Sequence, residues 1–465
     1  MRKRALLAAA ILAVLAWAMP PAPARGVGAV PEVPWDVHEE TLPNGLKVLL
    51  LRDSRVPVVT FMIWYRVGAR NELPGKTGLA HLLEHMMFKG TKRFGAKAFS
   101  NIVQRNGGRH NAFTSQDYTA YFERIAADRV EVAIELEADR MENLLLDSKE
   151  FLLERNVVQE ERRRSVDDNP TSFLWENLRG AAYQAHPYGS PVIGWETDIQ
   201  RLTAHEARHF YKAHYAPNNA FIVAVGDFEP NSIMTLIRKH FGPIPAGRAA
   251  PPVTAEEPPQ RGERRIRVEK PARLPYIGAA FHVPTYRKGD AYALDVLGEI
   301  LGGSASARLD RTLQRENQLV LSVGAGYPGI SIDPGMFTVY AQPAPGIPVK
   351  RVEDALWEQV EKLKKAPPTQ AELRRVKRRL AAEYVIRLDS QFYRAMALGR
   401  AEIAGSWNWL TEYLPKIAAV TAKDVMRAAQ NHLVEGNRTV GILDPLPLKG
   451  RRPAAGPRGG GGHIQ

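Results

Sequence analysis

The feature that most constrains the fold is a repeated order of segments on either side of a proline-rich stretch. Thr203 opens an apparent helix that leads into a strand, and Thr421 opens a similar helix that leads into a similar strand. The offset is 218 residues, and the strand region 45–51, shifted by this offset, falls on the alternating segment 263–269. The sequence therefore predicts two homologous domains.

The stretch between the halves is a linker. Six prolines lie between Phe241 and Arg265, where neither a helix nor a sheet can be sustained, and we expect this linker to be flexible. The predicted organisation is a signal peptide over residues 1–24, an N-terminal domain over 36–243, a linker over 244–264, a C-terminal domain over 265–445 and a disordered tail over 446–465.

The periodicity within the first half predicts an α+β fold. Residues 45–51 and 58–67 are rich in β-branched and aromatic side chains, which is typical of strands. Residues 109–115 and 118–125 predict an antiparallel pair, and two long amphipathic helices follow. Because the helices are grouped rather than alternating with single strands, we expect each domain to be a mainly antiparallel sheet with helices packed on one face.

The N-terminus has the features of an export signal. Three basic residues precede fifteen apolar residues, Ala5 to Met19, and the small-residue site Ala22-Pro23-Ala24 follows. The alternative is a membrane anchor, but a span needs about 20 apolar residues. We therefore expect cleavage after Ala24, no stable membrane span thereafter, and a periplasmic or secreted protein.

The net charge of +13 does not indicate a nucleic-acid partner. Three of the positive charges lie in the predicted signal and four in the tail, which leaves +6 for the folded body. A nucleic-acid binder would gather basic and aromatic residues on one surface, whereas the basic runs here are dispersed. The chain has no cysteine, so any metal site must use His, Asp or Glu.

The sharpest local pattern is His81-Leu82-Leu83-Glu84-His85. Residues four apart lie on one face of a helix, so both imidazoles can reach one ion, with Glu84 beside them. Two neutral imidazoles suit zinc, and a nearby carboxylate can take a proton from water and pass it to a leaving amine. The alternative is an amphipathic helix with two exposed histidines.

A third ligand has to come from another segment. The helix after Ser148 carries Glu154 and Glu161, seven residues apart and therefore on one face. One carboxylate could bind zinc while the other holds a histidine ligand or the substrate. The alternative is that both belong to a solvated, glutamate-rich surface.

With these motifs the chain resembles the inverzincin metallopeptidases, the pitrilysin/insulysin family that includes mitochondrial processing peptidase, whose motif is H-x-x-E-H. Four blocks carry the resemblance, in the order in which the family has them: residues 70–91, 107–122, 154–161 and 186–194. Glu161 lies 76 residues beyond His85, as the family spacing requires. The resemblance covers most of residues 36–445.

The resemblance implies a role for each residue of the motif. His81, His85 and Glu161 would bind one Zn²⁺ per chain, Glu84 would be the general base, and Glu154 would be an acidic residue behind the ligands. Glu160 is the competitor for Glu161, since it is adjacent in sequence but about 100° away around the helix.

The resemblance also implies where a substrate binds. The family pairs an unfolded peptide with an exposed edge strand, which here is Asn111, Ala112, Phe113 and Thr114; backbone pairing of this kind gives affinity with little sequence demand. The alternative is an ordinary strand packed against the zinc helix. His186, in a Pro-Tyr-Gly turn, fits a hydrogen-bonded structural residue better than a metal ligand.

The second half departs from the family pattern. The family has an Arg and, seven residues later, a Tyr that reach the substrate; here Gln314 and Leu321 stand at those positions, Arg315 is one residue out of place, and Tyr327 has the wrong spacing. We therefore expect pairing with a related subunit that lacks the zinc motif and supplies the Arg and Tyr.

The sequence thus predicts an exported zinc metalloendopeptidase that acts on peptides or unfolded segments within a chamber closed by the flexible linker. The alternative is a non-catalytic structural or assembly subunit of the same fold, but subunits of that kind usually have broken zinc motifs, and here every ligand is present.

Overall fold

The computed structural model describes residues 33–448. The predicted signal peptide, residues 1–24, lies outside the described residues, as does the predicted tail from residue 449 on. Among the described residues, no helix is both long enough and apolar enough to cross a membrane.

The first half is built on a six-stranded mixed sheet in the order β1-β2-β6-β3-β5-β4. Only the β2–β6 pair is parallel, and the other neighbours are antiparallel. The strands are β1 (Val37–Thr41), β2 (Lys47–Arg52), β3 (Val58–Tyr65), β4 (Arg109–Thr114), β5 (Thr119–Ala126) and β6 (Ala220–Gly226).

The second half repeats this topology. Its five strands follow the order β7-β11-β8-β10-β9, again with one parallel pair, β11–β7, in the place of β6 and β2. The strands are β7 (Arg264–Pro271), β8 (Tyr276–Val283), β9 (Val320–Gly326), β10 (Gly335–Pro343) and β11 (Arg438–Leu446). β11 ends one residue inside the predicted tail. The extra strand β1 was not predicted from the sequence. The Asn44-Gly45 pair between β1 and β2 is a hairpin turn signal that could have indicated it.

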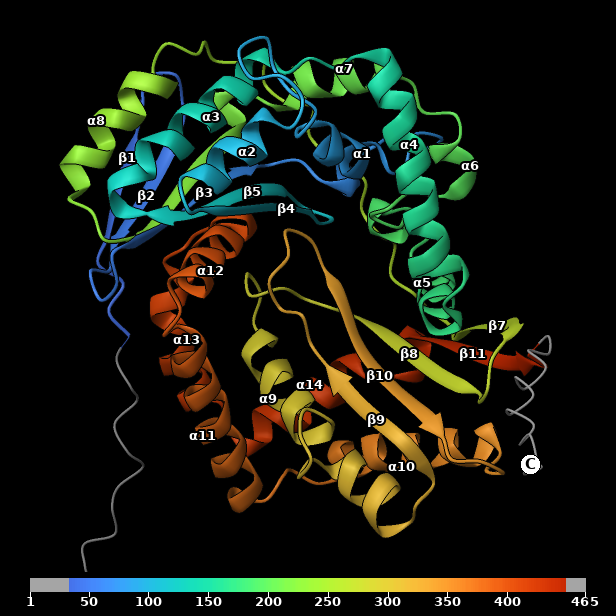
Figure 1. The fold of residues 1–465 in the computed structure, drawn as a ribbon. Coiled ribbons are helices and arrows are strands. Elements are labelled where there is room, and N and C mark those ends of the chain that lie inside the picture. Colours follow the sequence, from blue (N-terminus) through green and yellow to red (C-terminus); the bar gives the residue numbers. More distant parts are fainter. Residues whose placement is uncertain (1–32, 449–465) are drawn as a thin grey trace, which may run out of the picture.

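Helices surround both sheets (Figure 1). In the first half they are α1 (Leu79–Met86), α2 (Ala98–Arg105), α3 (Val130–Asn143), α4 (Ser148–Arg162), α5 (Pro170–Ala182), α6 (Glu196–Ile199), α7 (Ala204–His214) and α8 (Pro230–Phe241). In the second half they are α9 (Ala291–Leu301), α10 (Val349–Lys365), α11 (Gln370–Arg387), α12 (Gln391–Ala404), α13 (Trp409–Ala419) and α14 (Ala422–His432). The predicted α+β fold is confirmed.

The two helices that revealed the repeat also begin alike. The hydroxyls of Thr203 and Thr421 each accept a hydrogen bond from the backbone N–H three residues on, and the carboxylate of that residue, Glu206 or Asp424, accepts one from the threonine N–H. This capping box satisfies N–H groups that the first helical turn leaves without partners. Both helices lead into an inner strand of their sheet, β6 in the first half and β11 in the second.

Each half lends one helix to the sheet of the other half. α12 packs on β3 and β6, and α5 packs on β7, β8 and β11, as Figure 1 shows at opposite sides of the molecule. On the first sheet the contact is close: a Cβ added at Gly399 would lie 2.1 Å from the Trp64 ring. The sequence predicted helices on one face of each sheet, and this exchange of helices covers the second face.

The proline-rich stretch is anchored along its length. Glu257 accepts hydrogen bonds from the backbone N–H groups of Gln184, Ala185 and His186, at 2.8, 2.9 and 3.0 Å. Gly247 exchanges two hydrogen bonds with Asn218. The absence of helix or strand over residues 242–263 agrees with its prolines, and these hydrogen bonds connect the stretch to the first half; its expected flexibility stays a prediction.

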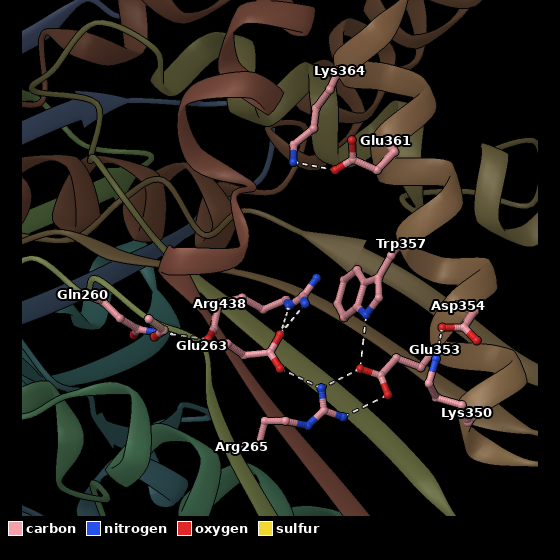
Figure 2. A network of polar contacts seen from close by, with 11 residues as sticks. Gln260, Glu263, Arg265, Lys350, Glu353, Asp354, Trp357, Glu361, Lys364 and Arg438 are labelled. Carbon is pink, nitrogen blue, oxygen red and sulfur yellow. Dashed lines mark hydrogen bonds and ion pairs between the residues drawn. The ribbon is translucent and has the colours of Figure 1, made fainter.

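The end of the stretch enters a polar network on the second half (Figure 2). Gln260 donates to the carbonyl of Arg438, and Glu263 binds the guanidinium groups of Arg265 and Arg438. Arg265 also forms a bidentate ion pair with Glu353 of α10, at 2.8 and 2.9 Å. The network ties the linker to β7, β11 and α10.

A loop between β9 and β10 joins the halves from the other side. Asp333 forms an ion pair with Arg70 at 2.8 Å and accepts a hydrogen bond from Nε2 of His186 at 3.1 Å. The backbone N–H of Ile332 donates to Asp117. His186 therefore has the structural role that its turn predicted, and it connects the two halves.

Candidate metal centre

The helix α1 is positioned by a buried carboxylate at its start. Glu72 accepts hydrogen bonds from the N–H groups of Gly78 and Ala80, at 2.9 and 2.7 Å. Burial raises the pKa of Glu72 to about 8. The buried face of the helix, with Leu82, Leu83 and Met86, packs into the core of the first half. His81, Glu84 and His85 are consequently turned away from that core.

The helix α4 packs against α1 and brings two carboxylates to the histidines. Glu161 Oε2 lies 3.8 Å from His81 Nε2 and 3.5 Å from His85 Nε2. Glu154 Oε1 lies 3.0 Å from His85 Nδ1. The structure thus joins segments 76 residues apart in the sequence in the arrangement that the motif implied.

This geometry fits a zinc ion. The ligand atoms of His81, His85 and Glu161 all lie within 4.8 Å of one another, and they form the only such group among residues 33–448. Donors at zinc-bond length around a tetrahedral ion would be about 3.4 Å apart. The Glu161 separations are longer than ordinary hydrogen bonds and close to this value, so they leave room for a metal between the donors.

Glu154 acts behind the ligands. Its contact with Nδ1 of His85 leaves Nε2 facing Glu161, which is the arrangement that carboxylates commonly impose on metal-binding histidines. Glu154 also forms an ion pair with Lys89. The hydrogen bond with His85, together with Lys89, lowers the pKa of Glu154 although burial opposes this.

The two histidines differ in charge preference. Burial, with a further contribution from His85, lowers the pKa of His81 to about 4. Burial also acts to lower the pKa of His85, but Glu154 and Glu161 outweigh it and raise the value to about 9. His81 therefore favours the neutral imidazole, the form that binds a metal. The surroundings of His85 favour a positive charge, whether carried by a proton or by a metal.

Glu160 is turned away from this cluster. Its carboxylate binds Arg163 at 2.7 and 2.8 Å and Arg164 at 2.7 Å, and these two arginines lower its pKa to about 2. Of the two adjacent glutamates, Glu161 is the one that faces His81 and His85.

Glu84 lies between the metal cluster and the strand β4. Its Oε2 accepts a hydrogen bond of 2.6 Å from the Thr114 hydroxyl. Burial raises the pKa of Glu84 although this hydrogen bond opposes it. Thr114 was predicted as a substrate contact, and its contact with Glu84 could not have been read from sequence spacing.

The strand β4 is the edge of the first sheet, so one side of its backbone has no neighbouring strand among residues 33–448. It carries Asn111, Ala112, Phe113 and Thr114, of which Asn111 is exposed. A cavity of about 380 Å³ adjoins the strand and is lined by Asn111, Glu84, His85, Glu154 and neighbouring residues. The edge is thus available beside the cluster.

In the second half, the residues at and near the positions of the family's Arg and Tyr make their polar contacts within that half. Gln314 Nε2 donates to the carbonyl of Leu321 on β9, where the leucine is 47% exposed. Arg315 is paired with Asp310. The hydroxyl of Tyr327 donates to the carbonyl of Pro284.

Comparisons with known proteins agree with this geometry. The family model described as "Insulinase (Peptidase family M16)" matches residues 47–196, and the model described as "Peptidase M16 inactive domain" matches residues 201–380. The first contains every residue of the cluster.

Individual relatives extend over most of the chain. The chain is 33% identical over 413 residues to "Zinc protease PqqE" of Helicobacter pylori, covering 88% of this chain and 93% of the relative. The crystal structure of a protease from Helicobacter pylori has a TM-score of 0.85 and 33% identity, over 88% of this chain and 99% of that one. The periplasmic protease PqqL from Escherichia coli shares the fold, with a TM-score of 0.74 and 17% identity over 89% of this chain and 48% of that one.

Proposed function

The chain belongs to peptidase family M16, and we propose that it is a zinc-dependent endopeptidase that hydrolyses short peptides and unfolded polypeptide segments. The observation that supports this most directly is the cluster of His81, His85 and Glu161, with Glu84 beside it. The intact cluster favours a catalytic subunit over a structural one.

We assign His81, His85 and Glu161 as the residues that would hold one Zn²⁺. When bound, zinc supplies Lewis-acid activation of the peptide carbonyl and lowers the pKa of water. Glu84 takes the proton of the attacking water and transfers it to the leaving amine. Glu154 holds His85 through Nδ1, and Thr114 holds the carboxylate of Glu84.

The substrate backbone pairs with the free edge of β4. A peptide added there is extended and is held mainly by main-chain hydrogen bonds, so it need not have one particular sequence. Asn111, Ala112 and Phe113 then lie along the bound peptide, and Thr114 lies next to Glu84. Short or unfolded chains offer such a strand most readily, because their backbone groups are not already paired within a fold, and this supports the proposed substrate class.

The role of Glu84 as general base is tested by Glu84→Gln. We expect hydrolysis of an internally quenched peptide to fall by about 10²- to 10⁴-fold, the usual contribution of a general base. Zinc content, measured by inductively coupled plasma mass spectrometry, should remain at one ion per chain because the ligands are unchanged. Hydrolysis at the wild-type rate with zinc bound would remove Glu84 from the mechanism.

We further propose that the active form includes a related subunit without the zinc motif. An apolar stripe on α4, with Leu153 and Val157 at 53% and 50% exposure, lies beside Glu161, and burial of such a stripe by a second chain would be favourable. Leu321 and Gln314 occupy the positions where the family carries its Tyr and Arg.

This pairing predicts that the purified chain gains activity when a related Arg- and Tyr-bearing subunit is added, and that the two sediment together. A homodimer that hydrolyses peptides at a rate no partner increases would contradict it.

We also propose that the enzyme lies outside the cytoplasm, because its sequence predicts an export signal. If the signal is cleaved after Ala24, intact-mass measurement should show a mature protein that begins at Arg25.

A further inference from the structure

A second cavity, of about 390 Å³, lies in the second half, between α9, α11, α12 and α13. It shares no lining residue with the metal centre, and Figure 1 places these helices on the other side of the molecule from α4. Most of its lining is aromatic or apolar, and its charged members are Asp295, Glu299, Glu383, Arg387 and Arg400. Its chemistry therefore differs from that of the zinc cluster.

One wall presents two buried carboxylates: Asp295 forms no ion pair among residues 33–448, and Glu299 has one long ion pair, with Arg379. Asp295 Oδ2 accepts hydrogen bonds from the hydroxyls of Tyr286 and Tyr413, each at 2.8 Å. Glu299, one helical turn further along α9, has a buried Oε2 with no hydrogen-bond donor among the described residues, and Arg379 is 3.6 Å away. Burial raises the pKa of Asp295 and raises that of Glu299 to about 7.

The position of Glu299 in α9 further disfavours its charged form. It lies two residues before the end of α9 at Leu301, where the helix dipole is negative and disfavours a carboxylate. A positive group entering the cavity would offset both the burial and the dipole. Tyrosine rings around the carboxylates, among them Tyr286, Tyr292 and Tyr413, suit an ammonium group because it is attracted to their faces.

The wall formed by α12 presents the opposite charge. Arg400 Nε is buried and has no hydrogen-bond acceptor among the described residues. Within residues 33–448, neither Arg400 nor Arg387 takes part in any of the ion pairs that the structure forms. A ligand with a second ammonium group would be repelled here, whereas a carboxylate would be bound.

From the buried Asp295 and Glu299 on one wall, and from Arg400 on the other, which forms no ion pair among residues 33–448, we infer that the cavity binds a short peptide with free ends, its ammonium group at Asp295 and Glu299 and its carboxylate at Arg400. The tyrosine rings and Met396 would surround its side chains. This site is separate from the zinc-dependent reaction and does not depend on it.

The test is isothermal titration calorimetry of the full chain carrying Glu84→Gln, so that the probe is not cleaved. The probe is the dipeptide Ala-Phe, compared with its N-acetylated, C-amidated form and with putrescine. We expect binding of the free dipeptide only. Asp295→Asn and Arg400→Gln should each weaken it by about 10- to 100-fold, since each removes a hydrogen bond to a charged group.

Two further variants keep the test decisive. Tyr393 lines the cavity but is 51% exposed, so Tyr393→Ala should fold and weaken binding several-fold. Arg311→Gln removes an exposed arginine outside the cavity and should change nothing. The inference is overturned if the blocked dipeptide or putrescine binds as tightly as the free dipeptide, or if Tyr393→Ala and Arg400→Gln bind it like the parent.

Discussion

The helices α1 and α9 occupy corresponding places in the two halves and carry different chemistry. Each follows the second strand of the repeat, α1 after β3 and α9 after β8. α1 presents His81 and His85 to a carboxylate from α4, whereas α9 presents Asp295 to tyrosines from α13 and the β8–α9 loop. A shared topology thus positions side chains without deciding what they do.

The comparison also shows how the halves depend on each other. α5 and α12 correspond in the repeat and are exchanged between the sheets, so neither sheet is covered by its own half alone. The outer face of the first sheet, with Trp64, Phe221 and Val223, is buried against Leu398 and neighbouring residues of α12. We therefore expect the two halves to unfold as one cooperative unit.

The largest expected effect distinguishes the two adjacent glutamates near the end of α4, Glu160 and Glu161. Glu161→Gln should lower zinc affinity by more than the about 10- to 100-fold that the loss of a partner behind a ligand usually costs, because a ligand itself is lost. The adjacent Glu160→Gln should leave zinc bound, since Glu160 contacts Arg163 and Arg164. Competition with a chromophoric chelator measures both. Zinc loss from Glu160→Gln alone would exchange their roles.

A second expected effect compares the exchanged helices. Gly399→Ala would force a Cβ to within 2.1 Å of Trp64, whereas Gly278→Ala brings a Cβ to 3.1 Å from Trp175 of α5. Overpacking of this kind costs about 1–3 kcal/mol, and we expect Gly399→Ala to be at the upper end and Gly278→Ala at the lower. Urea denaturation measures both free energies of unfolding. The reverse order would mean that the α12 contact yields more easily.

The smallest expected effect compares two capping glutamates as a function of pH. Burial would raise the pKa of Glu372, but hydrogen bonds of 2.9 and 3.0 Å from Arg308 outweigh it and hold the value at about 2. A depressed carboxyl pKa gives stability that is complete above the unfolded value, near 4.5, and is lost as the pH falls towards 2.

Glu372→Gln should therefore cost on the order of 1–2 kcal/mol at pH 7 and progressively less below pH 4. Glu206→Gln, at the same position of the α7 cap, should cost less at every pH, because its partner Lys76 is 3.2 Å away and more exposed. Thermal melts between pH 3 and pH 7 check this. A cost of Glu372→Gln that does not vary with pH would assign the effect to the cap alone.

Sequence reasoning reached the parts of the site that are local. The spacing of His81 and His85 needs only one helix, and the predicted helix starts at Thr203 and Thr421 need only a few residues each. The contact of Thr114 with Glu84 and that of Lys89 with Glu154 were beyond it, although Lys89, four residues after His85, is one helical turn away in sequence. Each depends on a second element that arrives by packing.

The sequence by itself determined the repeat, the helical spacing of His81 and His85 and the irregular backbone of the proline-rich stretch, because periodicity and proline chemistry act over a few residues. The tertiary structure decided that Glu161 rather than Glu160 faces the histidines, that α5 and α12 change places, and that Glu257 anchors the linker. These outcomes depend on which faces of distant elements meet, and burial and charge pairing act only once the chain has brought them together.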